Sequence, residues 1–258
     1  MSAKGVRRIL RSPREIAKMR EAGLVVWQSH QAVHRLLKPG VTTAELNAAV
    51  RQTFLDYRAE PLFLNYGGPP PFPAETCISI NEELVHGIPG PRKIKAGDIV
   101  KIDTGCRLNG WCGDAAYTHA VGDVSSVAKK LLSATLGALN LAIELMAVKK
   151  MWSEVAREIE AYVEDHGFCV VDTMVGHGIG QKLHESPQVP NYFDAEWAKE
   201  GDFDLRPGVV LAVEPMVNVG TPDLLELSDK WTQISADKSL TAHFEHTIAI
   251  TPDGPRRL

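Results

Sequence analysis

The chain reads KAGDIVKID over residues 95–103 and RPGVVLAVE over residues 206–214. Each copy places a basic residue and a glycine before an apolar run that ends in an acid, Asp103 in the first and Glu214 in the second. A His-Gly-Ile triplet precedes each copy, starting at His86 and at His177. This duplication favours a fold built from two similar halves.

A second acid follows each copy at the head of another strand-like run: Asp114 in the first half and Glu245 in the second. A buried lone carboxylate costs several kcal/mol unless it is paired or binds a metal. One such acid would be expected to cap a turn, but four acids in two matched copies are poorly explained in that way. Glycines on both sides of His177 allow close approach of an ion or a substrate, and imidazole is a common ligand. The set indicates a two-metal hydrolytic centre.

The dipeptide Asn109-Gly110 lies between two β-prone runs, which is a strong hairpin signal. A two-residue turn there pairs Gly105 with Asp114 and places Asp103 diagonally across from Asp114 on the same face. Such diagonal side chains lie about 7–8 Å apart, within reach of shared cations. A register slip of one residue would put the two acids on opposite faces. The predicted turn therefore supports the predicted site.

The remaining pattern alternates helices with strands. Capping boxes at Ser12 and Thr42 each begin a helix, and Pro39-Gly40 ends the first one. Further helices are predicted over 128–148 and 154–165, and strands over 77–80, 99–108, 209–219 and 243–250. Residues 65–73 form a Gly/Pro-rich loop. This order predicts an α+β fold with two pseudo-symmetric halves, in which helices cover a curved, mostly antiparallel sheet.

Length and composition set further bounds. The 258 residues fit one catalytic domain, 1–258, with a short N-terminal arm over 1–11. The net charge of −4 shows no footprint of nucleic-acid binding, and the basic cluster near the start is interpreted as a solvated helix face. That cluster comprises Arg7, Arg8, Arg11 and Arg14. Four cysteines without a framework predict free thiols, and no apolar run is long enough to cross a membrane, so we expect a cytoplasmic protein.

Several longer motifs occur in a fixed order. They are CISINE (77–82), VHGIP (85–89), GD (113–114), GHGIG (176–180), HE (184–185), PQV (187–189), VEPMVN (213–218), WT (231–232) and SLTAHFEHTI (239–248). In this order the chain resembles the pita-bread metallopeptidases, and most closely the type I methionine aminopeptidases. The resemblance extends from Ser12 to the TPDG at 251–254.

The resemblance implies a role for each acid and histidine of the site. Asp103 would chelate one metal ion, His177 and Glu214 the other, and Asp114 and Glu245 would bridge the two. An oxygen-rich set with one imidazole suits Co²⁺, Mn²⁺ or Fe²⁺.

The resemblance also implies which residues meet the peptide. His86 and His184 would contact it around the scissile bond, His184 would hydrogen-bond the developing oxyanion, and Glu214 would help take up a proton from water. The methionine pocket would be lined by Phe63, Tyr66, Phe72, Cys77, Leu183 and Trp231. The remaining histidines, including His243, are interpreted as structural.

The implied function is removal of N-terminal methionine from nascent proteins whose second residue is small. The enzyme would act as a monomer in the cytoplasm, near ribosomes, without a membrane or a specific nucleic acid. One alternative is a proline-directed aminopeptidase or prolidase, against which Cys77, Trp231 and the lack of a large N-terminal domain count. Another is a non-catalytic pita-bread protein that binds at ribosomes or RNA, but such a protein would be expected to have lost metal ligands.

Overall fold

The computed structural model describes residues 9–258, so most of the predicted arm over 1–11 lies outside the described residues, as do Arg7 and Arg8. The helices of this part of the chain are α1 (Pro13–Leu36), α2 (Thr43–Tyr57), α3 (Ser126–Leu145), α4 (Trp152–Asp165) and the short α5 (Trp197–Glu200). Both predicted capping boxes are present, since the side chains of Ser12 and Thr42 each accept from the backbone N–H three residues on. Helix α3 ends earlier than the predicted 148.

The strands of the described residues pair only in the antiparallel sense and form four hydrogen-bonded sheets. One sheet contains β1 (Glu60–Pro61), β2 (Cys77–Ile80), β4 (Ile99–Leu108) and β5 (Trp111–Ala120). A second contains β7 (Gly176–Gly178), β8 (Glu185–Val189), β9 (Val210–Val213), β14 (His246–Thr251) and β15 (Gly254–Arg257). Two small sheets contain β6 (Cys169–Val170), β10 (Met216–Asn218) and β13 (Thr241–His243), and β3 (Glu83–Val85), β11 (Leu224–Glu226) and β12 (Gln233–Ser235).

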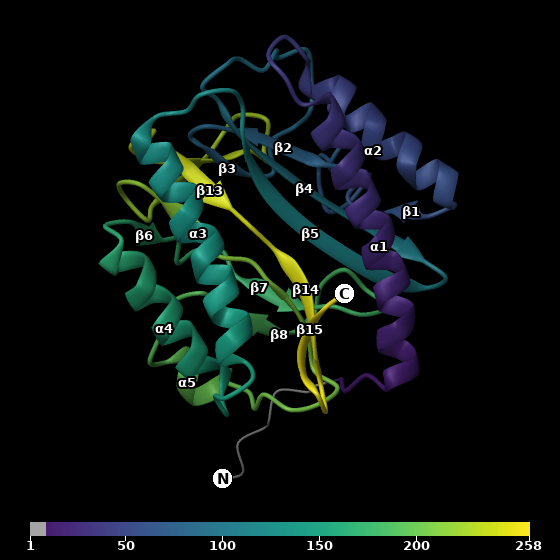
Figure 1. The fold of residues 1–258 in the computed structure, drawn as a ribbon, viewed down its shortest axis with the longest axis vertical. Coiled ribbons are helices and arrows are strands. Elements are labelled where there is room, and N and C mark those ends of the chain that lie inside the picture. Colours follow the sequence, from purple (N-terminus) through teal and green to yellow (C-terminus); the bar gives the residue numbers. More distant parts are fainter. Residues whose placement is uncertain (1–8) are drawn as a thin grey trace.

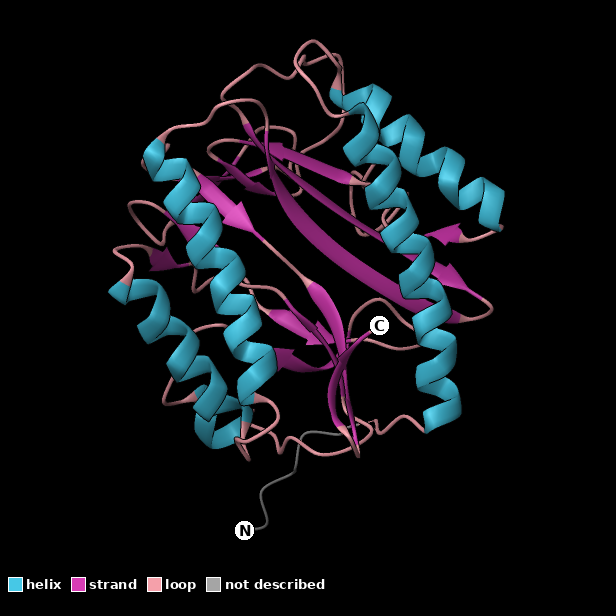
Figure 2. Cartoon of the chain, viewed as in Figure 1, coloured by secondary structure: helices cyan, strands magenta, loops and turns pink. Residues whose placement is uncertain are grey.

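The two halves are visible as two helix pairs flanking the strands. Helices α1 and α2 lie together beside β4 and β5, and α3 and α4 lie together beside the second half (Figures 1 and 2). Each pair covers its own apolar core: Val26, Val50 and Ile102 are buried in the first, and Leu139 and Ile159 in the second. The helices therefore leave the opposite side of the strands available for a site.

The hairpin of β4 and β5 has the predicted register. Gly105 pairs with Asp114, and Asn109 and Gly110 adopt left-handed backbone conformations with φ of 51° and 82°. Such angles at both central residues are what a tight hairpin turn requires. Asp103 consequently lies diagonally across from Asp114, as expected from the sequence.

Two strands that were predicted to be continuous are each divided into two shorter strands. The run 209–219 is divided into β9 and β10 at Glu214 and Pro215, and the run 243–250 is divided into β13 and β14 at Phe244 and Glu245. Pro215 has no N–H to donate to a ladder. On either side of each break the chain belongs to a different sheet, because β9 pairs with β14 whereas β10 pairs with β13. Both acids therefore lie where the regular pairing is interrupted.

Helix α1 lies against the outer face of the hairpin. A Cβ added at Gly113 would stand 2.5 Å from the backbone nitrogen of Gly23, so the close approach of β5 to α1 requires glycine. All four cysteines are free thiols, as predicted. Among the described helices, none has the length and apolar character needed to cross a bilayer.

Candidate active site

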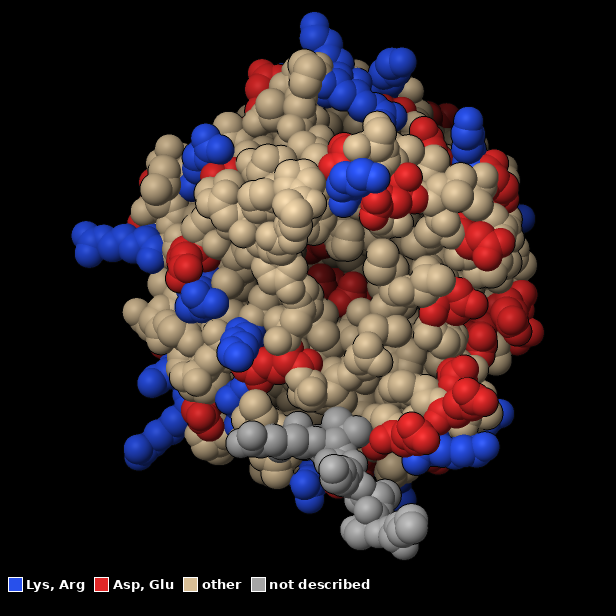
Figure 3. All heavy atoms as spheres, turned by 180° about the vertical axis from the view of Figure 1, so that it is seen from behind, with Lys and Arg blue, Asp and Glu red and all other residues tan. Residues whose placement is uncertain are grey.

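Every residue predicted for the site lines one cavity of about 220 Å³. They are Phe63, Tyr66, Phe72, Cys77, His86, Asp103, Asp114, His177, Leu183, His184, Glu214, Trp231 and Glu245. The face opposite the helices is hollowed near its middle, with acidic atoms at the base and mostly uncharged residues around them (Figure 3). The site thus combines a deep acidic floor with largely apolar walls.

The four carboxylates of the floor come from both halves. Asp103 and Asp114 belong to the hairpin of β4 and β5, and Glu214 and Glu245 lie in the two strand breaks. Burial raises the pKa of all four carboxyls, and the neighbouring carboxylates raise the pKa of Asp103, Glu214 and Glu245 further. One oxygen each of Asp103, Asp114 and Glu245 is buried without a hydrogen-bond partner among residues 9–258. Such a cluster of unpaired acceptors needs a compensating positive charge.

The His177 imidazole completes this acceptor cluster. Its Nδ1 lies 3.0 Å from the carbonyl oxygen of Gly178, and a proton placed there leaves the lone pair of Nε2 facing the carboxylates. Nε2 lies 3.6 Å from Oε1 of Glu214 and 3.9 Å from Oδ2 of Asp114. Burial lowers the pKa of His177 to about 3, which keeps the ring neutral. Acceptors therefore face acceptors, an arrangement that fits a divalent cation between them.

A compact trio lies at the centre of the floor. Ligand atoms of Asp114, His177 and Glu245 all lie within 4.8 Å of one another. Two carboxylates and one imidazole form a mixed oxygen and nitrogen donor set of the kind that binds divalent transition metals. The residues present therefore fit a metal ion on the chemistry of their donors.

Two further histidines, His86 and His184, line the cavity. The His184 ring lies 4.2 Å from the ring of His177, and its Nδ1 is hydrogen-bonded to the Tyr66 hydroxyl. His86 has a left-handed backbone with φ of 59°, and burial lowers the pKa of its ring to about 4. A non-glycine residue in that conformation persists only where its surroundings hold it.

The apolar wall depends on the Gly/Pro-rich loop. Residues 65–73 contain no regular element, as predicted, and the loop is tied to Trp231, whose Nε1 donates to the carbonyl oxygen of Pro70 at 2.9 Å. The Phe72 ring meets the Trp231 ring edge-on at 5.3 Å between centroids. Together with Phe63, Cys77 and Leu183 they form an uncharged wall of the cavity.

His243, which we interpreted as structural from the sequence, also lines the cavity. His243 is 1% exposed, and its Nε2 lies 3.3 Å from Oε2 of Glu214. Burial lowers its pKa to about 3, and both ring nitrogens lack a hydrogen-bond partner. Its position two residues before Glu245 was the available signal. Sequence reasoning also missed further lining residues, namely Val85, Met174, Val175 and Met216.

Comparison with known proteins identifies the family. A model described as metallopeptidase family M24 matches residues 17–252. The chain belongs to metallopeptidase family M24. It is 44% identical over 246 residues to methionine aminopeptidase 1 of Bacillus subtilis. This match covers 95% of this chain and 96% of the relative. It is 43% identical over 252 residues to a methionine aminopeptidase of Aquifex aeolicus, and this match covers 95% of this chain and 96% of that relative.

Solved structures share the architecture of this chain. The crystal structure of methionine aminopeptidase from Thermotoga maritima matches with a TM-score of 0.91 and 39% identity, over 97% of this chain and 98% of that one. The prolidase of Pyrococcus furiosus matches with a TM-score of 0.75 and 22% identity, over 97% of this chain and 65% of that one, and that likeness concerns the fold alone. The expected pita-bread fold and the expected resemblance are confirmed, and a metallopeptidase family agrees with the donor set of the floor.

Proposed function

We propose that this protein is a methionyl aminopeptidase, a hydrolase that removes the N-terminal methionine of nascent proteins when the second residue is small. The observation that carries the proposal is the position of an acceptor-only cluster at the floor of a slender apolar pocket. The relatives named as methionine aminopeptidases support the same substrate class.

We assign the metal-holding role to five residues. Asp103 would hold one divalent ion, His177 and Glu214 the other, and Asp114 and Glu245 would be shared between them. The proposed ions are Co²⁺, Mn²⁺ or Fe²⁺, because carboxylates and one imidazole suit these better than a sulfur-rich set would. Two such ions, when bound, polarise a carbonyl and supply an activated water.

The chain's own residues provide binding and proton transfer. With the Tyr66 hydroxyl donating to Nδ1, His184 keeps its proton on Nε2 and can donate to the peptide oxygen as negative charge develops there. His86, across the cavity, would contact the peptide beside the scissile bond. Glu214 would take up the proton of the attacking water.

The wall residues would select the N-terminal side chain. Cys77, Phe72 and Trp231 offer a thiol and aromatic surface, against which an unbranched thioether packs well. No charged group of the described lining stands among these walls, so a lysine or glutamate side chain would lose hydration without gaining a partner. The same walls favour methionine over the proline-directed alternative.

Three further features belong to the proposal. The whole chain would act as one catalytic domain, it would act as a monomer, and it would meet its substrates in the cytoplasm close to the ribosome. Size-exclusion chromatography with light scattering tests the monomer directly. Neither membrane binding nor specific nucleic-acid binding is needed for this activity.

The deciding experiment compares peptides on metal-loaded protein. Met-Ala-Ser, Lys-Ala-Ser and Ala-Pro peptides are assayed side by side, and bound metal is counted by mass spectrometry. We expect hydrolysis of Met-Ala-Ser to exceed that of the others by orders of magnitude. Asp114→Asn should abolish it, whereas the same change at the exposed Asp253, which is remote from the cavity, should leave it intact. Preferred cleavage of Ala-Pro would support the proline-directed reading instead.

A further inference from the structure

A buried lysine lies beside the acidic floor without an acidic partner. Lys101 on β4 is 1% exposed, and no carboxylate of the described residues lies within 4.0 Å of its Nζ. Lysine is almost never fully buried unless its charge is compensated. The position therefore needs an explanation from its surroundings.

Three oxygen atoms surround the Lys101 ammonium. Nζ donates to the carbonyl oxygen of Asn81 at 2.7 Å, to the carbonyl oxygen of Thr241 at 2.9 Å and to the Thr241 hydroxyl at 3.0 Å. Three acceptors match the three N–H groups that only the charged form possesses. The three oxygens thus form a cage around a cation, and this cation is the Lys101 ammonium of the chain itself.

The cage joins three segments that carry site residues. Lys101 lies two positions before Asp103, on the same face of β4. Asn81 occupies the left-handed turn, with φ of 58°, between β2 and the strand that leads to His86. Thr241 begins the strand that leads to Glu245. One ammonium therefore links the three segments that lead to Asp103, to His86 and to Glu245.

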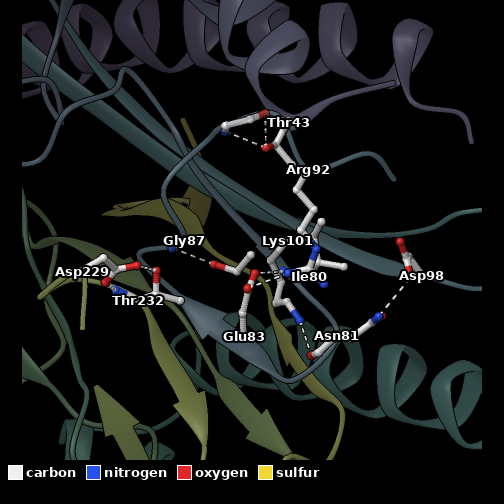
Figure 4. Close-up of polar contacts among 12 residues, drawn as sticks. Thr43, Ile80, Asn81, Glu83, Gly87, Arg92, Asp98, Lys101, Asp229 and Thr232 are labelled. Carbon is white, nitrogen blue, oxygen red and sulfur yellow. Dashed lines mark hydrogen bonds and ion pairs between the residues drawn. The ribbon is translucent and has the colours of Figure 1, made fainter. Parts of the chain in front are cut away.

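Several contacts hold the turn at Asn81, and Lys101 supplies one of them. Its carbonyl oxygen accepts from the N–H and the hydroxyl of Thr241 as well as from Lys101, while its side chain bonds Asp98 and the N–H of Ile99. Figure 4 shows the Lys101 side chain reaching Asn81 and the Asn81 side chain reaching Asp98. Without the ammonium, the buried carbonyl oxygens of Asn81 and Thr241 would each lose a donor, and β4 would lose its side-chain link to both segments.

We propose that Lys101 is a positioning residue, a built-in cation whose oxygen cage sets the spacing of Asp103, His86 and Glu245. The inference rests on the hydrolytic function proposed above, and it adds a residue that does not touch the substrate. A displacement of about 1 Å at a catalytic group can cost about 10²-fold in rate, so a small movement of these segments would be felt in catalysis.

The test removes the charge and then returns it. Lys101→Met keeps most of the length of the side chain but not its charge, and we expect its kcat/KM on Met-Ala-Ser to fall by about 10²-fold, with weaker binding of Mn²⁺ measured by calorimetry. Lys129→Met is the matched control, since Lys129 is 62% exposed and pairs with Asp123 at the surface. In Lys101→Ala, added methylammonium should restore part of the kcat/KM and part of the Mn²⁺ binding. Tetramethylammonium, which has no N–H, should restore neither.

Thr241→Val provides a second route if Lys101→Met does not fold. It removes the hydroxyl that accepts from Lys101 and contacts the carbonyl oxygens of Asn81 and Glu83, while leaving both carbonyl oxygens of the cage, and we expect a fall of about tenfold in kcat/KM. Unchanged kcat/KM and Mn²⁺ affinity in the folded variants, beside an active wild type, would overturn the role of Lys101 alone. A metal-loaded wild type that hydrolyses none of the peptides would overturn the proposed function and this inference with it.

Discussion

Arg11 and Glu185 form a buried ion pair whose loss should be measurable. Arg11 Nη2 donates to Oε2 of Glu185, and the two side chains are 7% and 9% exposed. The other carboxylate oxygen accepts two backbone N–H groups of the preceding loop at 3.0 and 3.1 Å. Arg11→Met would keep part of the apolar stem but leave the Glu185 carboxylate buried without its cation.

The size of the effect follows from what remains. Removing one partner of a buried ion pair typically costs about 3–5 kcal/mol. The two backbone N–H groups still stabilise the Glu185 carboxylate, so we expect the lower end, about 3 kcal/mol in the free energy of unfolding. At about 2–4 °C per kcal/mol for a chain of this size, the melting temperature should fall by about 6–12 °C.

Urea unfolding at a fixed metal concentration measures this loss in Arg11→Met, in Glu185→Gln and in the double variant. The double variant should lose less than the sum of the single changes, because it leaves no unpaired charge. Arg256→Met is the control: its partner is the exposed Asp253, and its effect should stay within about 0.5 kcal/mol. A loss below about 1 kcal/mol in Arg11→Met, or full additivity, would refute the reasoning.

Three further changes probe the site and its support. Glu245→Gln should lower kcat/KM by orders of magnitude at unchanged circular dichroism, since an amide cannot compensate two cations; near-normal turnover would contradict the shared-ligand role. His184→Ala should lower kcat by about 10²–10³-fold without reducing bound metal, and a metal-free variant would reassign it as a ligand. Gly113→Ala should destabilise by about 1–3 kcal/mol in urea, because its Cβ would stand 2.5 Å from the backbone nitrogen of Gly23; wild-type stability would show that α1 can shift.

Features with strong local signals were predictable from the sequence. The Asn109-Gly110 pair admits few backbone conformations, and once the turn is fixed the register follows residue by residue to Asp103 and Asp114. The helix starts at Ser12 and Thr42 were equally determined by capping chemistry. The cavity residues were predicted from motifs that occur in the same order as in the pita-bread metallopeptidases.

Features that depend on distant partners were not predictable. Arg11 belongs to a basic cluster that resembles a solvated face, but its partner Glu185 is 174 residues away. The breaks at Glu214 and Glu245 fall inside strand-like runs that continue past them, and the parts of each run are distinguished by the pairing of β9 with β14 and of β10 with β13. His243 was taken as structural because the sequence does not show that Glu214 comes to lie against it.

The two halves repeat in sequence but place their acids by different devices. In the first half an unbroken hairpin sets Asp103 and Asp114 diagonally on one face. In the second half the strands are interrupted, and the interruption leaves the Glu245 N–H free to donate to the carbonyl oxygen of Ala116 at 2.8 Å, opposite Asp103 in the hairpin. Thr247 continues this contact, because its hydroxyl bonds both the N–H and the carbonyl oxygen of Asp114. The interruption of the strand at Glu245 therefore attaches the second half to the first and brings the carboxylates of both halves to one floor.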